Sequence, residues 1–357
     1  MKKYPGRTLS VETKFEILRF SAAAGIAVLL SFAIIALVSR EPAAAARNLF
    51  LGPLSAWRRF GNVLELAITL TFAGLAVSVM FSANQFNMGA EGSFYASGAA
   101  AAMAALGLPL PPALHPAAAI ALGALTGAFV CAVPALLKAR WGASELVSSL
   151  MLNYVFFYAA RYAVNALYKD PGSGYIATYF LPLSAKLPRI LSGTRVHAGL
   201  FIALLAVILT VLFMRRTTWG YALIQTGRNP AFAEYAGINT GAVLIYSQLI
   251  GGGIAGAGGA VEILGMYDRF QWQAMPGYGF DGVIVAILAK NKPQWVPVAA
   301  FLLAYIRIGA DRMATAADVT SEMIAIVQGV IIMLAAAQSF MSGRRQKMLV
   351  KELKTHG

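Results

Sequence analysis

The chain has 357 residues, of which 59% are hydrophobic and 12% are charged, and its formal net charge is +14. Soluble domains carry about a quarter charged residues, so this composition excludes an ordinary soluble protein and predicts a polytopic membrane protein. Backbone polar groups must be paired internally in lipid, and long unalternating apolar runs predict an all-α fold rather than a barrel. The basic residues fall largely between these runs and at the ends, which indicates membrane topology rather than nucleic-acid binding.

Ten apolar segments are candidate transmembrane helices. They are residues 20–38, 61–82, 88–107, 115–137, 143–167, 198–214, 241–265, 279–290, 295–313 and 317–338. The first is longer than the apolar part of a signal peptide, which favours a retained span. The distribution of Lys and Arg among the short connecting segments predicts cytoplasmic N- and C-termini. We therefore expect a cytoplasmic segment over residues 1–19, a membrane domain over 20–340 and a basic cytoplasmic tail over 341–357.

Between the second and third segments lies "FNMGAEG", residues 86–92, with an amide and a carboxylic acid where lipid-facing sequence would be apolar. On one continuous helix, Asn84, Asn87 and Glu91 would share a polar face. Alternatively, the glycines of the motif break the helix and release backbone groups for solute or water. Glu91 has no basic neighbour in sequence, so a role in a proton relay is a further alternative.

The fifth segment carries Glu145, Ser149, Asn153, Phe157 and Arg161 at four-residue intervals, which predicts a polar stripe along one helix face. Ionisable and amide groups in lipid are costly and normally face the bundle interior or a water-filled cavity. The stripe therefore lines a transport path or forms hydrogen bonds between helices.

Two long connections follow. Residues 168–197 contain three prolines and lie on the outside in this topology; we expect an extracellular loop with short interfacial helices. Residues 215–240 form a cytoplasmic loop, in which Asn229 and Pro230 are a good helix start signal. That loop is either a solvated surface helix or a docking element for a cytoplasmic partner.

Two later segments, 241–265 and 279–290, have distinctive patterns. Gly252, Gly256 and Ala260 are spaced at four residues inside an apolar run, which predicts close helix packing rather than a nucleotide site. The segment 279–290 is short and follows "QAMPGYG", so it is either a half-helix bordering a transport pathway or a tilted helix with a ragged start.

Enzyme chemistry is not indicated by this sequence. No nucleotide-binding P-loop is present, the three histidines are scattered, and the single cysteine, Cys131, has no partner within the chain. We predict a protein that is not an enzyme and that has no metal site.

Four motifs together resemble one family. "FNMGAEG", "SELVSSLMLNY", "GRNPAFAEYAGIN" and "PGYGFDGVIVAIL" occur in the order and spacing of permease subunits of bacterial ABC importers of the branched-chain amino acid, ribose and nucleoside type. Among these, the chain is most similar to the nucleoside-importing branch served by basic-membrane-protein lipoproteins. Family members often have Gln where Ser93 stands and an apolar-glycine ending where Lys290 stands.

The resemblance implies a multi-pass protein of a bacterial cytoplasmic (inner) membrane that pairs with a second, related permease. It also implies a cytoplasmic ABC ATPase, which would hold ATP and Mg²⁺ in place of this chain, and an extracytoplasmic substrate-binding protein, which in the nucleoside-importing branch is a lipoprotein. The expected ATPase-coupling loop contains Gly227, Arg228, Asn229, Pro230 and Glu234.

The leading hypothesis is thus a permease that forms the translocation path for a nucleoside or a similar small polar solute. A ribose-like sugar or a branched-chain amino acid is the alternative cargo, and a proton-coupled secondary transporter using Glu91 is the alternative mechanism. The candidate path residues are Phe86, Asn87, Glu91, Asn153, Tyr154, Phe157 and Asp281.

Overall fold

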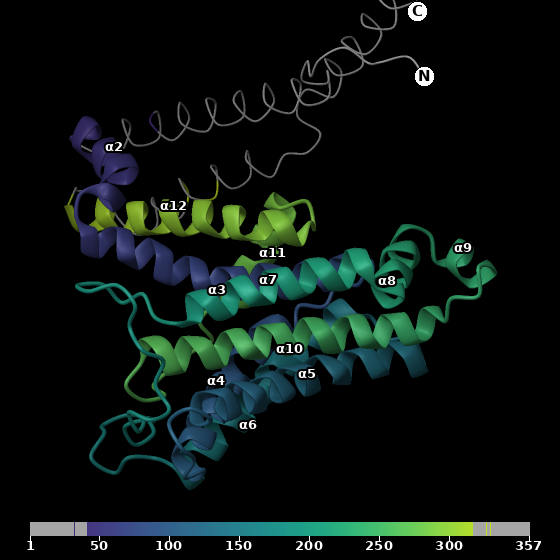
Figure 1. The fold of residues 1–357 in the computed structure, drawn as a ribbon, viewed down its shortest axis with the longest axis horizontal. Helices are drawn as coiled ribbons and strands as arrows, with labels where there is room; N and C mark the ends of the chain where they lie inside the picture. Colours follow the sequence, from purple (N-terminus) through teal and green to yellow (C-terminus); the bar gives the residue numbers. More distant parts are fainter. Residues whose placement is uncertain (1–31, 33–40, 317–325, 327–328, 330–357) are drawn as a thin grey trace, which may run out of the picture. The chain divides into compact units, whose positions relative to one another are not determined.

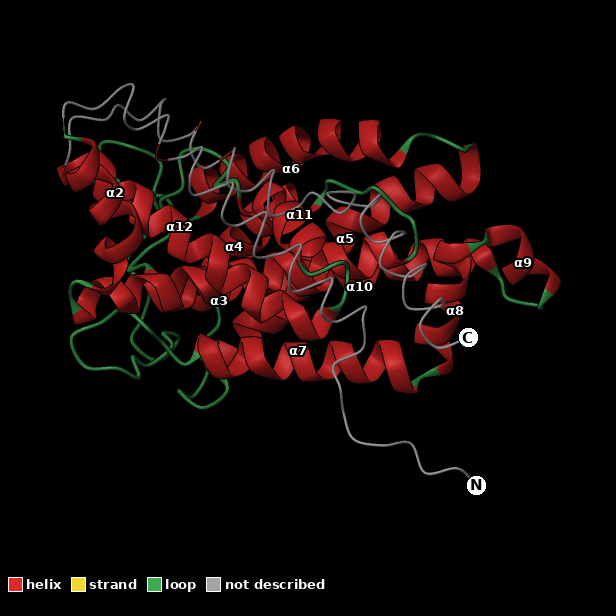
Figure 2. Cartoon of the chain, turned by 90° about the horizontal axis from the view of Figure 1, so that it is seen from above, coloured by secondary structure: helices red, strands yellow, loops and turns green. Residues whose placement is uncertain are grey.

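The computed structural model describes residues 32, 41–316, 326 and 329 of the chain. It divides into two compact units, one from residues 54–305 and the other from residues up to 53 together with those from 306 onward. Within the described residues the regular structure is helical, and β pairing is limited to two isolated bridges. Figure 2 shows the described segments as helices joined by loops.

Helices occupy most of the predicted spans. They are α2 (Pro42–Leu51), α3 (Trp57–Ser82), α4 (Ala90–Gly107), α5 (His115–Trp141), α6 (Glu145–Leu167), α7 (Gly199–Arg216), α8 (Thr218–Arg228), α9 (Pro230–Tyr235), α10 (Thr240–Met266), α11 (Tyr278–Leu288) and α12 (Val296–Ala316), with 3-10 turns at Gly52–Leu54 and Pro293–Trp295. The predicted spans 20–38 and 317–338 lie almost wholly outside the described residues. Helix α2 was not anticipated, because its alanine-rich sequence is too short to read as a span.

Four of these helices, α3, α5, α7 and α10, are long and apolar enough to cross a bilayer. Helix α4 is different because nearly all of it is buried among α3, α5, α6 and α10, so its alanines and glycines meet protein rather than lipid. The fold is therefore that of an all-helical polytopic membrane protein. The count of ten spans and the side on which the termini lie stay predictions.

Helices α5 and α10 run side by side with their backbones in close contact (Figure 1). A Cβ atom added at Gly127 of α5 would collide with the Gly252 carbonyl of α10 and would lie 2.7 Å from the Gly256 Cα. The four-residue spacing of Gly252 and Gly256 therefore serves close helix packing, as predicted.

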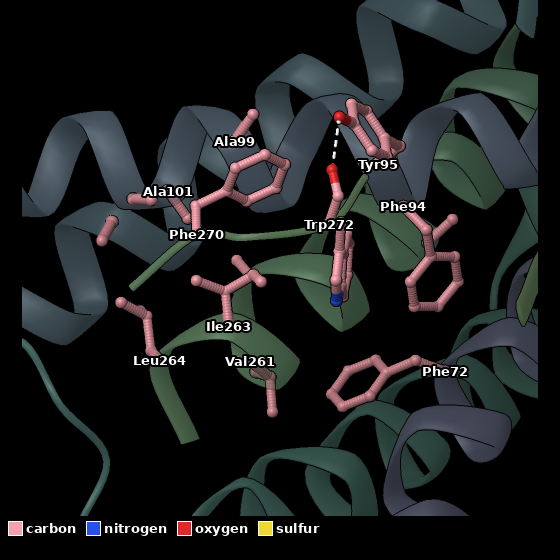
Figure 3. Packing of buried hydrophobic residues seen from close by; sticks show 14 of the residues in the cluster. Phe72, Phe94, Tyr95, Ala99, Ala101, Val261, Ile263, Leu264, Phe270 and Trp272 are labelled. Atoms are coloured by element: carbon pink, nitrogen blue, oxygen red, sulfur yellow. Dashed lines mark hydrogen bonds between the residues drawn. The ribbon is translucent and has the colours of Figure 1, made fainter. Parts of the chain in front are cut away.

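The main core gathers aromatic rings from α3, α4 and the segment after α10 (Figure 3). Phe72, Phe94 and Tyr95 pack with Phe270 and Trp272, and the Tyr95 hydroxyl donates a hydrogen bond to the Trp272 carbonyl at 2.9 Å. This bond ties the non-helical segment that follows α10 to the centre of α4.

The loop over residues 168–198 contains no helix, so the expectation of short interfacial helices was wrong. Its backbone instead pairs with the chain that leaves α10: the Thr178 N–H donates to the Phe270 carbonyl at 3.0 Å, and the Leu187 N–H donates to the Leu264 carbonyl at 3.0 Å. Pro182 and Pro188 disfavour helix here, and the pairing across the chain satisfies the backbone groups that a helix would otherwise satisfy.

Several residues that the predicted topology places on the cytoplasmic side lie together at one end of the 54–305 unit. Lys138 at the end of α5 forms an ion pair with Glu145 of α6 at 2.6 Å and donates to Gln85, just after α3, at 2.9 Å. Helices α8 and α9 lie at this end as well, away from the long loop (Figures 1 and 2).

Candidate functional site

The chain between α3 and α4 is not helical. Helix α3 ends at Ser82, α4 begins at Ala90, and Asn84 takes a left-handed backbone conformation with φ 57°. Of the two geometries considered for "FNMGAEG", the structure has the broken one, so Asn84, Asn87 and Glu91 do not share a helix face. The backbone groups of this break need partners inside the protein.

The polar stripe of α6 supplies those partners one after another. Glu145 accepts from the Phe86 N–H at 3.3 Å, and Ser149 accepts from the Met88 N–H at 2.9 Å. One turn further on, Asn153 accepts from the Gly92 N–H at 3.0 Å and donates to the Met88 carbonyl at 3.0 Å. The stripe thus forms hydrogen bonds between segments, which was one of its two interpretations.

Asn87 is fully buried and also has both ends of its amide in use. Its nitrogen donates to the side-chain oxygen of Gln248 on α10, and its oxygen accepts from the Gly89 N–H at 2.6 Å. In this conformation Asn87 links the break to α10 and closes the turn that starts α4.

Glu91 connects α4 to a second break in the chain. Residues 267–277 leave α10 without helical structure, and α11 begins at Tyr278 after Gly277, whose φ of 83° suits glycine. One carboxylate oxygen of Glu91 accepts from the Gly277 N–H and the other from the Gly279 N–H, both at 2.7 Å. A carboxylate that accepts two orphan N–H groups at a helix N-terminus is favoured by both hydrogen bonding and the helix dipole.

Helix α11 is the short helix that the sequence predicted over 279–290, and it begins inside the protein. Gly279 and Asp281 in its first turn are buried, the latter 3% exposed. The chain therefore has a short helix with a buried start at this position, and that it borders a transport pathway stays a prediction. Discontinuous helices of this kind border substrate paths in transporters, and their N-termini carry partial positive charge.

A further buried polar cluster escaped the sequence analysis. Glu262 of α10 accepts hydrogen bonds from the Thr69 hydroxyl of α3 and, at 3.2 Å, from the Tyr278 hydroxyl of α11. Glu65 lies one helical turn from Thr69, close enough to Glu262 for the two carboxyl groups to repel each other when both are ionised. The signal was present, since both glutamates fall within predicted spans, where an ionisable residue normally indicates a functional or structural polar site.

The three aromatic candidates have different environments. Phe157 is buried against Tyr95, with ring centroids 4.6 Å apart, so it belongs to the core. Phe86 is half exposed and lies 5.0 Å from the ring of Phe81. Tyr154 is 57% exposed on the outer face of α6. The structure therefore does not bring these rings together with Asn87, Glu91 and Asn153 around one cavity.

The predicted coupling loop folds into two helices. Asn229 caps α9 as expected, because its side-chain oxygen accepts from the Phe232 N–H at 3.1 Å, with Pro230 at the first helical position. Glu234 at the end of α9 accepts from the Thr240 hydroxyl at 2.7 Å, and Gly227 at the end of α8 lies against the Ser82 carbonyl. This hairpin therefore packs on the end of α3 and on the start of α10.

No group of three His, Cys, Asp or Glu side chains within the described part of the chain is arranged to hold a metal ion. The two histidines in the described part of the chain, His115 and His197, form hydrogen bonds with different partners. His115 forms a hydrogen bond with Ser184 at 2.9 Å, and His197 accepts from the Gly199 N–H at 3.1 Å.

Comparison with known proteins places these features in a family. A family model described as the permease component of a branched-chain amino acid transport system matches residues 59–336. A glucose ABC transporter permease of Haloferax volcanii is 31% identical over 84% of this chain and 82% of its own length. A guanosine ABC transporter permease of Bacillus subtilis is 31% identical over 80% of this chain and 84% of its own.

A nucleoside ABC transporter permease of Lactococcus lactis is 28% identical over 82% of each chain. No solved structure gives a significant match. The matched region contains both chain breaks, the α6 stripe and the α8–α9 hairpin. The chain therefore belongs to the family of permease components of branched-chain amino acid transport systems, and it is a membrane transport subunit rather than an enzyme.

Proposed function

We propose that this chain is a permease subunit of an ATP-driven importer and forms the path for a nucleoside or a similar small polar solute. The names of two relatives, permeases for guanosine and for nucleosides, support this class of cargo, whereas the glucose permease supports the sugar alternative. In this proposal a separate ABC ATPase binds ATP and Mg²⁺ at the end of the protein that carries α8 and α9. An extracytoplasmic binding protein of the lipoprotein type delivers the solute at the end that carries the 168–198 loop.

The observation that carries the proposal is the construction of the α8–α9 hairpin. Leu223 is fully buried, which anchors α8 in a small core with residues of α3, α7 and α10. On the other side, Phe232 is 57% exposed and Tyr235 is 94% exposed, next to Arg228. Large apolar side chains at a loop tip are typical of a protein-binding surface, and here the surface has a rigid connection to the bundle.

Helix α11 is the element that we expect to respond to the ATPase. It is short, begins within the protein and is held at its N-terminus by Glu91 of α4. Motion of the hairpin would reach α11 through α3, which packs against both elements. Asn87 and Asn153 then act as positioning residues for the break that starts α4, whereas Asp281 lies in the first turn of the moving helix.

A second, related permease is the occupant that we propose for the outer face of α6. Tyr154, Tyr158 and Tyr162 follow one another along this face and are 57%, 63% and 73% exposed. A tyrosine hydroxyl in the middle of a membrane needs a polar partner that lipid tails do not provide. The exposed face of α7, by contrast, presents leucine and isoleucine and suits lipid. We propose a bacterial cytoplasmic membrane as the location.

The proton-coupled alternative is less well supported by the geometry of Glu91. Both of its oxygens already accept backbone N–H groups at the start of α11, and protonation of either oxygen would weaken one of these two hydrogen bonds. A proton carrier needs access to water on either side, and Glu91 is 0% exposed.

Replacement of residues 228–234 by a Gly/Ser linker tests the proposal. We expect the ATPase to no longer co-purify, or its hydrolysis to proceed without solute uptake, because the docking surface is lost. Phe201→Ala, which removes a similarly exposed ring from the α7 face that we assign to lipid, is the control and retains both. Undiminished coupled uptake with the linker would overturn the assignment of the hairpin.

A further inference from the structure

An open pocket of ≈ 560 Å³ lies where the 168–198 loop meets the non-helical segment after α10. Its walls include four aromatic rings and two primary amides, from Tyr175, Tyr267, Gln271, Trp272, Gln273 and Tyr278. This volume is within the range of roughly 300–1,000 Å³ that is typical of small-molecule sites. The pocket is at the opposite end of the unit from the α8–α9 hairpin.

The walls of the pocket are fixed by contacts between the two segments. Arg269 forms an ion pair with Asp170 at 3.2 Å and donates to the Tyr175 hydroxyl at 2.9 Å. The Gln273 side chain donates to the Ile176 carbonyl at 2.7 Å, and the Trp272 carbonyl accepts a hydrogen bond from the Tyr95 hydroxyl. A site whose walls are ordered before binding loses less entropy when a ligand enters.

The lining residues carry no ionised side chain. A zwitterionic amino acid or a phosphorylated solute would have to compete with Asp170 for the Arg269 guanidinium beside the pocket, and transfer of a charge away from water without a partner is costly. Aromatic faces instead suit a flat, uncharged ring. The Gln271 amide nitrogen and the Gln273 side-chain oxygen have no partner among the described residues, which leaves one donor and one acceptor for the edge of such a ring.

We infer that this pocket is a receiving site for an uncharged nucleoside, whose base stacks on the ring of Tyr175 or its neighbours while its edge pairs with Gln271 and Gln273. This inference rests on the proposed function and narrows it, because it separates nucleosides from branched-chain amino acids. The pocket also lies beside the break at α11: Tyr278, one of its walls, is the first residue of that helix and donates to Glu262. A solute in the pocket therefore contacts the helix whose N-terminus Glu91 holds.

The test is direct binding to the assembled complex without its binding protein, reconstituted in nanodiscs, with tritiated guanosine, glucose and leucine as probes. Stacking of a base on an aromatic ring contributes roughly 1–3 kcal/mol, so Tyr175→Leu should weaken guanosine binding about five- to a hundredfold. Tyr175→Phe keeps the ring and should stay within about threefold of the unmodified complex, which separates stacking from the hydroxyl's structural hydrogen bonds. Tyr179→Leu, in the same loop but outside the pocket, is the matched control.

The outcomes distinguish the two proposals. Guanosine uptake by the unmodified complex together with unchanged guanosine binding in Tyr175→Leu would overturn the pocket and leave the importer standing. Leucine or glucose binding as tightly as guanosine would also contradict the pocket assignment. Failure of the unmodified complex to bind or import guanosine, with ATP-driven uptake of another solute intact, would overturn the nucleoside assignment itself.

Discussion

Glu91→Gln is the substitution that most sharply probes how α11 is held. The amide keeps one oxygen but presents an NH₂ group to the second backbone N–H, so one of the N–H groups of Gly277 and Gly279 loses its acceptor. A buried N–H without a partner costs about 1–3 kcal/mol, and loss of the negative charge at the helix N-terminus adds up to about 2 kcal/mol. We therefore expect a destabilisation of about 1–5 kcal/mol and slower uptake, because α11 is no longer fixed at its start.

The assay is the Tm of the purified complex in detergent, followed by tryptophan fluorescence, together with solute uptake in proteoliposomes. At about 2 °C per kcal/mol, the Tm should fall by roughly 2–10 °C. Glu234→Gln makes the same chemical change at an exposed site and should shift the Tm by less than about 1 °C. An unchanged Tm for Glu91→Gln would refute the capping role, and selective loss of a proton-driven uptake mode would restore Glu91 as a proton carrier.

Three further expectations concern the α6 stripe, the α5–α10 contact and the loop. Asn153→Leu leaves the Gly92 N–H and the Met88 carbonyl without the Asn153 partner, and should lower stability by about 2–6 kcal/mol in denaturant unfolding. A loss below about 1 kcal/mol would contradict the role of the α6 stripe in satisfying these backbone groups. Gly127→Ala overpacks the α5–α10 contact and should cost about 1–3 kcal/mol, whereas Gly253→Ala, where a Cβ has room, should not; equal effects would argue against close packing. Burial lowers the pKa of His197 from 6.5 to about 4, so between these values the unfolded chain binds a proton that the folded chain does not. Stability should therefore fall by about 2 kcal/mol between pH 7 and pH 5, and the pH dependence should be flatter in His197→Leu; parallel curves would contradict a neutral buried His197.

Features that depend on residues close in sequence, such as helix ends and caps, could largely be predicted. Helix boundaries follow apolar length, the Asn229 cap follows a short-range rule, and the four-residue spacing on α6 places its polar groups on one face. Which segment that face contacts could not be predicted from the sequence. Asn153 and Met88 are 65 positions apart, and nothing in the sequence near either residue indicates that the α6 stripe forms hydrogen bonds with the backbone between α3 and α4.

The same reason explains what was missed. The Thr69–Glu262 contact joins residues 193 positions apart, and the fold of the 168–198 loop depends on backbone pairing with the segment after α10. Asn87, Glu91 and Asn153 were chosen as candidate path residues for their polar side chains in or beside apolar spans, yet they use that polarity to satisfy backbone groups. Buried polar residues in a membrane protein are therefore ambiguous from sequence, because a broken helix needs them as much as a solute does.

The central claim is that ATP hydrolysis in a partner drives a nucleoside through this chain. Its most direct test is reconstitution with the cognate second permease, ATPase and binding protein in proteoliposomes, with measurement of ATPase rate and guanosine uptake. We predict that guanosine-loaded binding protein stimulates hydrolysis and uptake together, and that the linker replacement of residues 228–234 abolishes this stimulation. Guanosine uptake driven by a pH gradient in vesicles that lack the ATPase would contradict the account.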